Sequence, residues 1–564
     1  MPVRGVPRVR RIRRITALTV ALGALVTVAP ATATDAASTD AAATAPVGRM
    51  PLGPDDLVTV AKPAQTPAEG ITYEKYTQGR ATDVWSVEVL IKQPSTWSAG
   101  RKENADAVVA ALQAKQFAAR VDTWELPAGP GVGAGLPRQY TVRVGAFAPD
   151  RSADAAALLK SLQAAGFTGR TVYTAQDGNP STGPWEVRVV RVDPSAALTF
   201  KAVHGSDVAR AETVRDMGAA AGALVAVNGS DFDIDSPNNP AFSDYDGDPQ
   251  GLYVRSKDLL SEANNGRTAL LLEGTGARVR VDEVSTRTQV TAHDGAVKVI
   301  DGINRATGRN VGCGGVGDDR RRNAKDELVL ELRPVRNTLC VDPDEIVVFR
   351  PEWGTDTPSP AAGDSVDVVM DGNWVVTGLR QPAGGPVPAG GRVMQGIGAG
   401  ADWLRAHSTV GKAFKPGTSI TDSQGASVSG SALSAVAGGG PALVRDGEIL
   451  VNADANGMLN PDTNVVTSGV VQRHPRTLAG VTASGELLLV NVDGRLPQTS
   501  VGVTVHEAAA VMKWLGAKDA LSLGSGGDTT LLINGTLYNR PMDSWQAAAS
   551  VERKVGNAVV VVPR

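Results

Sequence analysis

The order of hydrophobic and polar positions predicts two regions of different architecture. Between residues 84 and 175 a strand–helix–strand pattern occurs twice, as strands over 84–91 and 118–124 around a helix over 104–115, and strands over 140–147 and 170–173 around a helix over 153–165. Two such units bury little surface alone. We therefore expect them to share one four-stranded sheet with two helices, as a small ferredoxin-like domain.

The pattern changes after residue 183 and predicts a larger domain that extends to residue 564. Strands are predicted over 185–192 and 223–227, with a helix over 212–221 between them. Two hairpins are predicted where Asp446-Gly447 and Ser484-Gly485 separate apolar runs. The 63 glycines and 34 prolines favour many turns. The fold class is therefore α+β, with a repeat domain followed by a strand-rich mixed α/β domain of catalytic type.

The N-terminal residues predict export. Six arginines precede an apolar run over 15–29, and Ala31-Thr32-Ala33 supplies a cleavage site. This is typical of a signal peptide over residues 1–33; the alternative is a retained anchor, for which the run is short. Residues 34–83 are rich in Ala, Thr, Pro and Asp, which predicts a flexible spacer. We expect a secreted, cell-envelope protein with no membrane attachment after cleavage and, at a net charge of −3, no nucleic-acid partner.

Two groups of residues suggest a disulfide and a possible metal site. Cys313 and Cys340 are the only cysteines, and in an exported chain they predict one disulfide. Six aspartates in a short acidic loop could bind calcium, although a solvated loop explains them as well and the spacing is not that of an EF-hand: Asp231, Asp233, Asp235, Asp244, Asp246 and Asp248. No other metal and no cofactor is predicted.

Residues 473–541 carry the densest set of polar strand ends. Gly526 and Gly527 follow a predicted strand over 519–523 and could form an anion-binding nest, with Ser525 and Thr529 beside it. Arg476 and Arg495 lie at strand ends and could clamp a phosphate. Asp528 and Glu507 are candidate proton-transfer groups. Glu507 also has capping-box spacing to Thr504, so a purely structural role at the start of a helix is an equal alternative.

The second copy of the repeat, QYTVRVGAF…ADAAALLKSLQAAGF, resembles the SPOR family. The resemblance covers residues 84–175, with a more divergent first copy. It implies a partner, the glycan strands of peptidoglycan. A ferredoxin-like domain without a ligand is the alternative.

The larger domain resembles the phosphodiester glycosidase family through VAVNGSDF, INRATGRN, AGGGPALVRDG, RTLAG, LLLVNVDGR and LGAKDALSLGSGGDTTLLINGT. The resemblance implies hydrolysis of a sugar-1-phosphodiester, of N-acetylglucosamine type. It points to Asn228, Arg476, Asp493, Arg495, Glu507, Gly526, Gly527 and Thr529. One departure concerns the strand end, where the family has L-D-G-G-G-S-T-T: here Gly524 replaces the aspartate and Asp528 replaces the serine.

The leading hypothesis is a secreted hydrolase that acts on a phosphodiester-linked glycan and is anchored by the repeat domain. In it, Asp528, Glu507, Arg476 and Arg495 are catalytic, and Asn228, Asp493, Ser525, Gly526, Gly527 and Thr529 bind substrate. One alternative is a catalytically degenerate protein that binds envelope glycans or phosphate. A two-carboxylate glycosidase is another.

Overall fold

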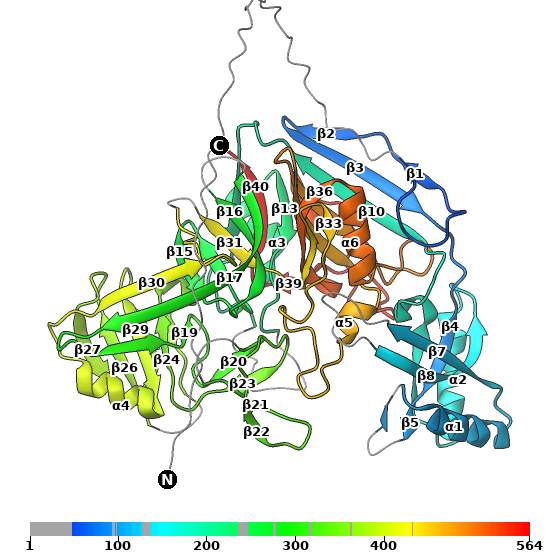
Figure 1. Ribbon diagram of the computed structural model, residues 1–564, viewed down its shortest axis with the longest axis horizontal. Coiled ribbons are helices and arrows are strands. Elements are labelled where there is room, and N and C mark those ends of the chain that lie inside the picture. Colours follow the sequence, from blue (N-terminus) through cyan, green and yellow to red (C-terminus); the bar gives the residue numbers. More distant parts are fainter. Residues whose placement is uncertain are drawn as a thin grey trace, which may run out of the picture. The chain divides into compact units, whose positions relative to one another are not determined.

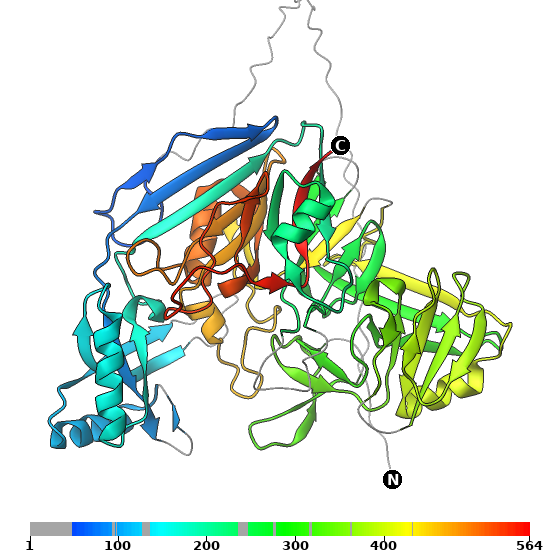
Figure 2. The same ribbon diagram turned by 180° about the vertical axis from the view of Figure 1, so that it is seen from behind.

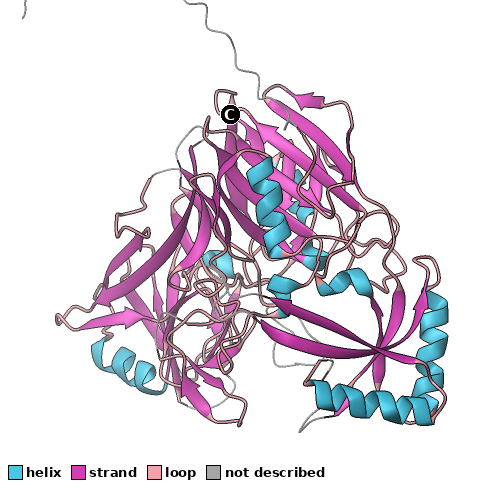
Figure 3. Ribbon diagram, turned by 45° about the vertical axis from the view of Figure 1, so that its right-hand side comes forward, coloured by secondary structure: helices cyan, strands magenta, loops and turns pink. Residues whose placement is uncertain are grey.

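The computed structural model describes residues 48–92, 96–97, 99–126, 136–234, 246–273, 278–314, 318–360, 364–430 and 433–564. All of them belong to one compact unit, Pro46–Arg564. Strands dominate this unit and helices are few (Figure 3). The predicted signal peptide and residues 34–47 of the predicted spacer lie outside the described residues. Within the described part of the chain, no helix is long and apolar enough to cross a membrane.

The repeat region contains the predicted four-stranded sheet and two helices. Its strand order is β7-β8-β4-β9. The two copies bury equivalent helix positions. Ala105 and Leu112 are buried in the first helix, and Ala155 and Leu162 occupy the same places in the second. The phenylalanines that follow the helices, Phe117 and Phe167, meet edge to face at 6.3 Å. The elements are β4 (Trp85–Val89), α1 (Lys102–Ala114), β7 (Ala119–Leu126), β8 (Leu136–Phe147), α2 (Ser152–Ala164) and β9 (Gly169–Tyr173).

A nine-stranded antiparallel sheet forms the centre of the larger domain and includes part of the predicted spacer. The spacer prediction is wrong for residues 59–78, because β3 pairs with β10 over the full length of both strands. Ile71, Tyr73, Tyr76 and Gln78 of β3 supply buried side chains to this sheet. The strands, in spatial order, are β1 (Thr59–Ala61), β3 (Ile71–Gln78), β10 (Trp185–Val192), β35 (Leu487–Val492), β34 (Arg476–Thr482), β36 (Ala517–Ser525), β32 (Ala442–Arg445) and β33 (Glu448–Ile449), and β2 (Gln65–Ala68) pairs with β3.

A second sheet packs against one face of the first, and each sheet carries a helix on its other face. Along β10, Val187 and Val189 face the core under α6 (Val505–Trp514), whereas Val190 and Val192 face the second sheet. The result is four layers, with α6 on the viewer's side in Figure 1 and α3 (Val214–Ala221) on the viewer's side in Figure 2. The second sheet consists of β11 (Leu198–Val203), β40 (Ala558–Pro563), β13 (Val225–Asn228), β37 (Leu531–Ile533) and β38 (Thr536–Leu537).

Three further sheets lie between residues 253 and 437. In the second of them, β29 leads directly into α4 (Gly398–His407), so the glycine-rich run over 396–401 is a strand-to-helix turn in an antiparallel sheet. The first sheet has β15 (Asp258–Ser261), β14 (Tyr253–Arg255), β31 (Ser434–Ala437), β16 (Arg267–Glu273), β17 (Arg278–Thr291) and β18 (Val297–Ile300), with β30 (Lys415–Thr421) paired to β17. The second has β19 (Gly302–Ile303), β24 (Ile346–Phe349), β29 (Arg392–Ile397), β26 (Ser365–Met370) and β27 (Val376–Arg380), and the third has β20 (Arg309–Val311), β23 (Leu339–Val341), β21 (Arg320–Arg322) and β22 (Leu328–Leu330).

Short elements complete the fold. The predicted disulfide between Cys313 and Cys340 is present beside β23, and it ties the loop after β20 to the third of these sheets. The short elements are the strand pairs β5 (Ile91–Lys92) with β6 (Thr96–Trp97), β12 (Glu212–Thr213) with β39 (Lys554–Val555) and β25 (Asp356–Thr357) with β28 (Gly385–Pro386), the helix α5 (Ser468–Val471), and the 3₁₀ turns η1 (Thr174–Asp177), η3 (Pro351–Trp353) and η4 (Gly526–Asp528).

Candidate functional site

The two packed sheets are joined at one edge by Asn228, the last residue of β13. Its side-chain Nδ2 donates to the Gly524 carbonyl at 3.0 Å, and its Oδ1 accepts from Thr477 Oγ1 at 2.6 Å and from the Thr530 amide at 3.1 Å. Asn228 is fully buried. Its amide group is therefore a fixed connector between β13, β34 and the loop after β36, and it holds that loop in place.

The glycine loop after β36 is fixed by the protein itself. The Gly524 and Gly526 amides donate to the carbonyls of Gly229 and Pro475, at 2.8 and 2.9 Å. Gly526 has a φ of 76°, which favours glycine. A Cβ on Gly527 would lie 2.0 Å from Asp543 Oδ1. The Gly526 amide of the predicted anion nest is thus already bonded to the backbone, as is the Gly524 amide before it, and close side-chain packing explains Gly527.

Asp528 places its carboxylate next to the space above Gly524. A Cβ built on Gly524 would lie 3.2 Å from Asp528 Oδ2 and 2.8 Å from Asn228 Nδ2. The other oxygen, Oδ1, accepts from Arg553 Nη1 at 2.9 Å. Burial raises the pKa of Asp528 to about 6, although Arg553 opposes the shift. The chain therefore has a buried carboxylate beside position 524, supplied from four residues further along.

A pocket of about 320 Å³ opens beside this loop, and we call it the core pocket. Two guanidinium groups line it from different parts of the chain. Asp231 binds Arg336 through both oxygens, one of them 3.0 Å from Arg336 Nη2. Arg495 donates to the carbonyls of Met542, at 2.9 Å, and Asp543. The lining residues are Arg336, Asn337, Thr467, Ser468, Gly469, His474, Arg495, Ser525 and Gly526.

The electrostatics of the core pocket favour an anion. Arg495 forms no ion pair with any described carboxylate. Burial and the nearby Arg553 together lower its pKa to about 10. Its backbone has a φ of 61°, a left-handed conformation that is uncommon outside glycine and is concentrated at functional sites. A bound anion would compensate the buried charge of Arg495 and offset its repulsion from Arg553.

His474 is a pocket residue that the sequence analysis missed. Its Nδ1 lies 3.2 Å from Arg495 Nη2. Since a guanidinium can only donate, Nδ1 is the acceptor, and a neutral His474 carries its proton on Nε2. Burial, together with the positive charges of Arg476, Arg495 and Arg336, lowers the pKa of His474 well below its usual value. The available signal was its position in the RHPR string directly before β34.

Two of the sequence-predicted catalytic residues lie away from the pocket lining. Arg476 is buried at the start of β34 and donates to the carbonyls of Val503 and Gly469, at 2.8 and 2.7 Å. Burial lowers its pKa to about 9. Its described contacts are with backbone carbonyls, so it joins β34 to the segments before it and before α6.

Glu507 completes the capping box of α6. Its carboxylate accepts from the Thr504 amide at 2.9 Å, while its own amide donates to Thr504 Oγ1 at 3.1 Å. Arg473 pairs with the same carboxylate, at 3.0 and 3.1 Å from its Nε. The structure thus puts Glu507 in the structural role that its spacing allowed.

Of the predicted substrate-binding residues, Ser525 and Gly526 line the core pocket, whereas Asp493 and Thr529 are buried away from its lining. Asp493 accepts from Arg188 Nη1 at 2.7 Å and from the Arg540 amide at 3.0 Å. Burial raises its pKa. The Thr529 hydroxyl is buried without a hydrogen-bond partner among the described residues.

The acidic loop does not gather its described carboxylates around one point. Asp231 pairs with Arg336, and Asp233 accepts from Arg309 Nη2 at 2.6 Å. Asp246 accepts a long hydrogen bond from the Ala211 amide, at 3.4 Å. No group of three or more His, Cys, Asp or Glu side chains suited to a metal exists in the part of the chain that the structure describes. Of the six predicted ligands, Asp235 and Asp244 lie outside the described residues, whereas Asp248 lies within them.

A second pocket, of about 430 Å³, shares His474 and Arg495 with the core pocket, and we call it the repeat-side pocket. Its opposite wall comes from α2, β9 and η1. The repeat region is held there by packing, since Trp85 and Tyr173 belong to the same core cluster as Trp185 and Trp545. The lining residues are Leu159, Gly169, Arg170, Thr171, Val172, Gln176, His474, Arg495, Asp543, Ser544, Trp545 and Gln546.

Comparison with known proteins supports a hydrolase-type domain. The sequence model of the phosphodiester glycosidase family matches residues 364–562, which include the glycine loop, Arg495 and Arg553. A search of curated proteins finds no match. The similarity to this family is therefore confined to the C-terminal part of the chain, and the earlier residues of the site, Asn228, Asp231 and Arg336, lie outside the matched range.

Among solved structures, a protein of Burkholderia pseudomallei that is described as exported is similar over nearly its whole length. It is 29% identical, with a TM-score of 0.78, and the alignment covers 92% of this chain and 99% of the other. Two weaker likenesses have TM-scores below 0.5. A hypothetical protein from Synechocystis is 16% identical, with a TM-score of 0.49. The alignment covers 90% of this chain and 80% of the Synechocystis chain. The zebrafish N-acetylglucosamine-1-phosphodiester alpha-N-acetylglucosaminidase catalytic domain is 12% identical, with a TM-score of 0.32. The alignment covers 85% of this chain and 89% of the zebrafish domain.

Proposed function

We propose that this chain is an exported hydrolase that releases a sugar, of N-acetylglucosamine type, from a sugar-1-phosphodiester at the cell envelope. The position of the Asp528 carboxylate beside Gly524 carries the proposal. The family resemblance requires an acid at position 524, and the chain supplies one from position 528 to nearly the same space, 3.2 Å from where the missing Cβ would be. The departure in sequence is therefore small in space.

The core pocket supplies the other groups that the reaction needs. Arg336 and Arg495 bind the charged phosphodiester oxygens, since guanidinium groups form charge-assisted hydrogen bonds with phosphate. Neutral His474 donates from Nε2 to a further oxygen. A fixed array of donors stabilises the charge that develops during the reaction, because it requires no reorganisation.

Asp528 handles the proton. Water adds to the reacting centre while the Asp528 carboxylate accepts its proton. One bond to the bridging oxygen breaks, and the products are the free sugar and a phosphomonoester. Attack at the anomeric carbon breaks the C–O bond, and attack at phosphorus breaks the P–O bond. Reaction in ¹⁸O-labelled water separates the two, because the label enters the sugar in the first case and the phosphomonoester in the second.

The repeat region extends this site and supports a polymeric substrate. We propose that it binds the glycan strands of peptidoglycan, as its SPOR resemblance implies. Its packing against the core, through Tyr173 and Trp545 at a ring distance of 5.3 Å, favours a fixed wall of the site over a flexible tether. A bound glycan strand would then pass Arg170 and reach His474 and Arg495 through the repeat-side pocket.

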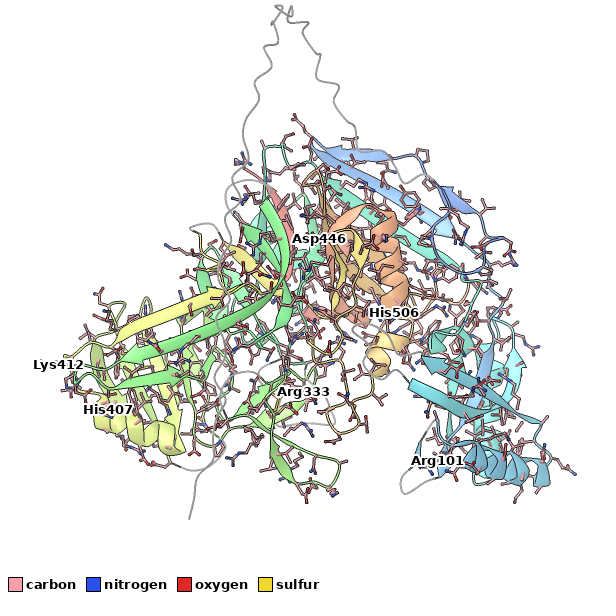
Figure 4. All side chains as sticks on the ribbon, in the orientation of Figure 1. Arg101, Arg333, His407, Lys412, Asp446 and His506 are labelled. Atoms are coloured by element: carbon pink, nitrogen blue, oxygen red, sulfur yellow. A yellow bond between two sulfur atoms is a disulfide. The ribbon has the colours of Figure 1, made fainter. Side chains whose placement is uncertain are left out.

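The decisive experiment measures free sugar released from a methyl diester of N-acetylglucosamine 1-phosphate by the chain without residues 1–33. Arg336→Met should raise KM at least tenfold, and Asp528→Asn should lower kcat by two to three orders of magnitude, within the range of general-base catalysis. The matched control is Arg333→Met, which removes an exposed arginine outside the core pocket, labelled in Figure 4. Binding of the diester without any release would instead identify a non-catalytic envelope-binding protein.

Anchoring is tested separately with the same chain. It should sediment with peptidoglycan whose stem peptides an amidase has removed, and less with untreated peptidoglycan. Arg170→Met should weaken this sedimentation without changing release from the small diester. Equal sedimentation with both preparations would contradict the proposed partner.

A further inference from the structure

A third cavity, separate from the site described above, lies among the sheets between residues 253 and 437. Its volume is about 380 Å³, within the range of small-molecule sites. It shares no lining residue with the core pocket or the repeat-side pocket. We propose that this cavity, which we call the side pocket, binds a small organic anion that has an apolar body. Its lining residues are Lys257, Asp258, Leu259, Thr288, Ile303, Val348, Arg350, Trp374, Arg392, Thr418, Ser419, Ile420, Ser427, Val428, Ser429, Gly430 and Leu433.

The charged groups of the side pocket are mainly cationic. Lys257, Arg350 and Arg392 face one carboxylate, that of Asp258. Asp258 pairs with Arg350 at 3.0 Å. Arg350 also pairs with Glu352 at 3.4 Å, whereas Lys257 and Arg392 form no ion pair with a described carboxylate. An anionic ligand would give these two cations a partner.

Arg392 is the group that most needs a partner. No described carboxylate lies within ion-pair distance of it. One nitrogen, Nη2, donates to the Gly372 carbonyl at 3.2 Å, while Nε is buried without a hydrogen-bond partner among the described residues. Burial lowers the pKa of Arg392, and the nearby Arg350 lowers it further. Two guanidinium groups that repel each other in a partly buried cavity form an anion site.

Trp374 holds the Arg392 guanidinium in position. The guanidinium carbon lies 4.4 Å from the centroid of the Trp374 ring, at cation–π distance. Trp374 itself has a φ of 65°, and Lys257, across the lining, has a φ of 75°. Lys257 belongs to the two-residue turn between β14 and β15, where left-handed backbone is expected, and Trp374 lies in the turn between β26 and β27. The Arg392–Trp374 pair therefore combines charge with aromatic support in the cavity lining.

The rest of the lining defines the body of the ligand. Leu259, Ile303, Val348, Ile420 and Val428 provide an apolar wall, and the hydroxyls in the lining come from serine and threonine. Small-molecule sites typically combine an apolar lining with a few polar groups that fix orientation. A ligand with a carboxylate or phosphate at one end and an acyl or aromatic body fits this distribution.

The test uses two fluorescent probes with the same apolar body. Anilinonaphthalene sulfonate is an anion, and N-phenyl-naphthylamine is its neutral counterpart. The chain without residues 1–33 should bind one equivalent of the anion saturably, and Arg392→Met should weaken that binding at least tenfold while leaving the neutral probe within twofold. The control is Arg287→Met, which removes an exposed arginine of β17 next to the pocket residue Thr288.

Two further arms keep the proposal falsifiable. Ile420→Trp, which fills the cavity from β30, should abolish binding of both probes, and circular dichroism should show that both pocket variants remain folded. Displacement of the anionic probe by decanoate or by decyl phosphate supports the site and separates carboxylate from phosphate ligands. The proposal is overturned if anionic-probe binding survives Arg392→Met or Ile420→Trp, or if decanol displaces it as well as either anion. Sugar release should be unchanged in both variants, so failure here is distinct from failure of the proposed hydrolase.

Discussion

Replacing Asp528 with asparagine should stabilise the folded chain at alkaline pH while it removes hydrolysis. Burial raises the pKa of Asp528 from 3.8 to about 6. At about 1.4 kcal/mol per pKa unit, keeping this group ionised costs the fold roughly 3 kcal/mol. Because the folded-state pKa lies above the unfolded one, the cost is absent below pH ~4, grows between pH ~4 and ~6 and is complete above that. Asparagine keeps an oxygen for Arg553 but has no charge to bury.

Urea unfolding at two pH values measures this effect. At pH 8 the free energy of unfolding of Asp528→Asn should exceed that of the wild type by up to about 3 kcal/mol, and at pH 4 the two should agree within about 0.5 kcal/mol. Asp543→Asn is the matched control, because Asp543 also pairs with Arg553 but its side chain is 55% exposed. We expect it to change stability by less than ~1 kcal/mol at both pH values. A destabilised Asp528→Asn at pH 8, or equal stabilisation at both pH values, would refute the reasoning.

Three further predictions concern the frame of the site. Replacing Cys313 and Cys340 together with alanine should lower the free energy of unfolding by about 3–4 kcal/mol, and dithiothreitol should reproduce the loss in the wild type. Glu507→Gln should cost about 1–2 kcal/mol of stability and leave kcat/KM within threefold, since the residue caps α6; a hundredfold loss of kcat would return it to the mechanism. Gly524→Asp should lower the free energy of unfolding by about 1–3 kcal/mol through crowding and like charge. A second change, Asp528→Ser, should restore much of that loss. If urea unfolding shows that the effects of the two changes simply add, the two side chains are not in contact.

The elements with a clear period were predictable from the sequence. The helices over 102–114 and 152–164 and the strand over 185–192 lie within two residues of their predicted bounds. The spacer prediction failed because β3 pairs along its full length with β10, a partner more than a hundred residues away. Composition describes a segment by itself, whereas a strand is stabilised by its neighbours across the sheet.

The core pocket was less predictable than the sheets around it. Arg336 comes from the region between β22 and β23, and it is brought to the site by Asp231, which the sequence suggested only as part of a calcium loop. Arg476 and Arg495 looked equivalent, as arginines at the ends of neighbouring strands. The structure separates them, because carbonyls of Val503 and Gly469 bind the first, whereas the second reaches the pocket.

The exchange at positions 524 and 528 shows why a motif can break in sequence and persist in space. The η4 turn over Gly526–Asp528 folds the chain back, so that the side chain of Asp528 points toward the strand residue four positions earlier. Gly524 leaves room for this carboxylate, since a Cβ there would lie 3.2 Å from Asp528 Oδ2, closer than an ordinary van der Waals contact. The two substitutions therefore depend on each other: the glycine without the aspartate would leave this strand end without a carboxylate, and two acids would put like charges into one buried space. On this argument the altered loop is a compensated version of the strand end in the family that the chain resembles, and of these two positions only Asp528 should supply the acid for the proposed hydrolysis.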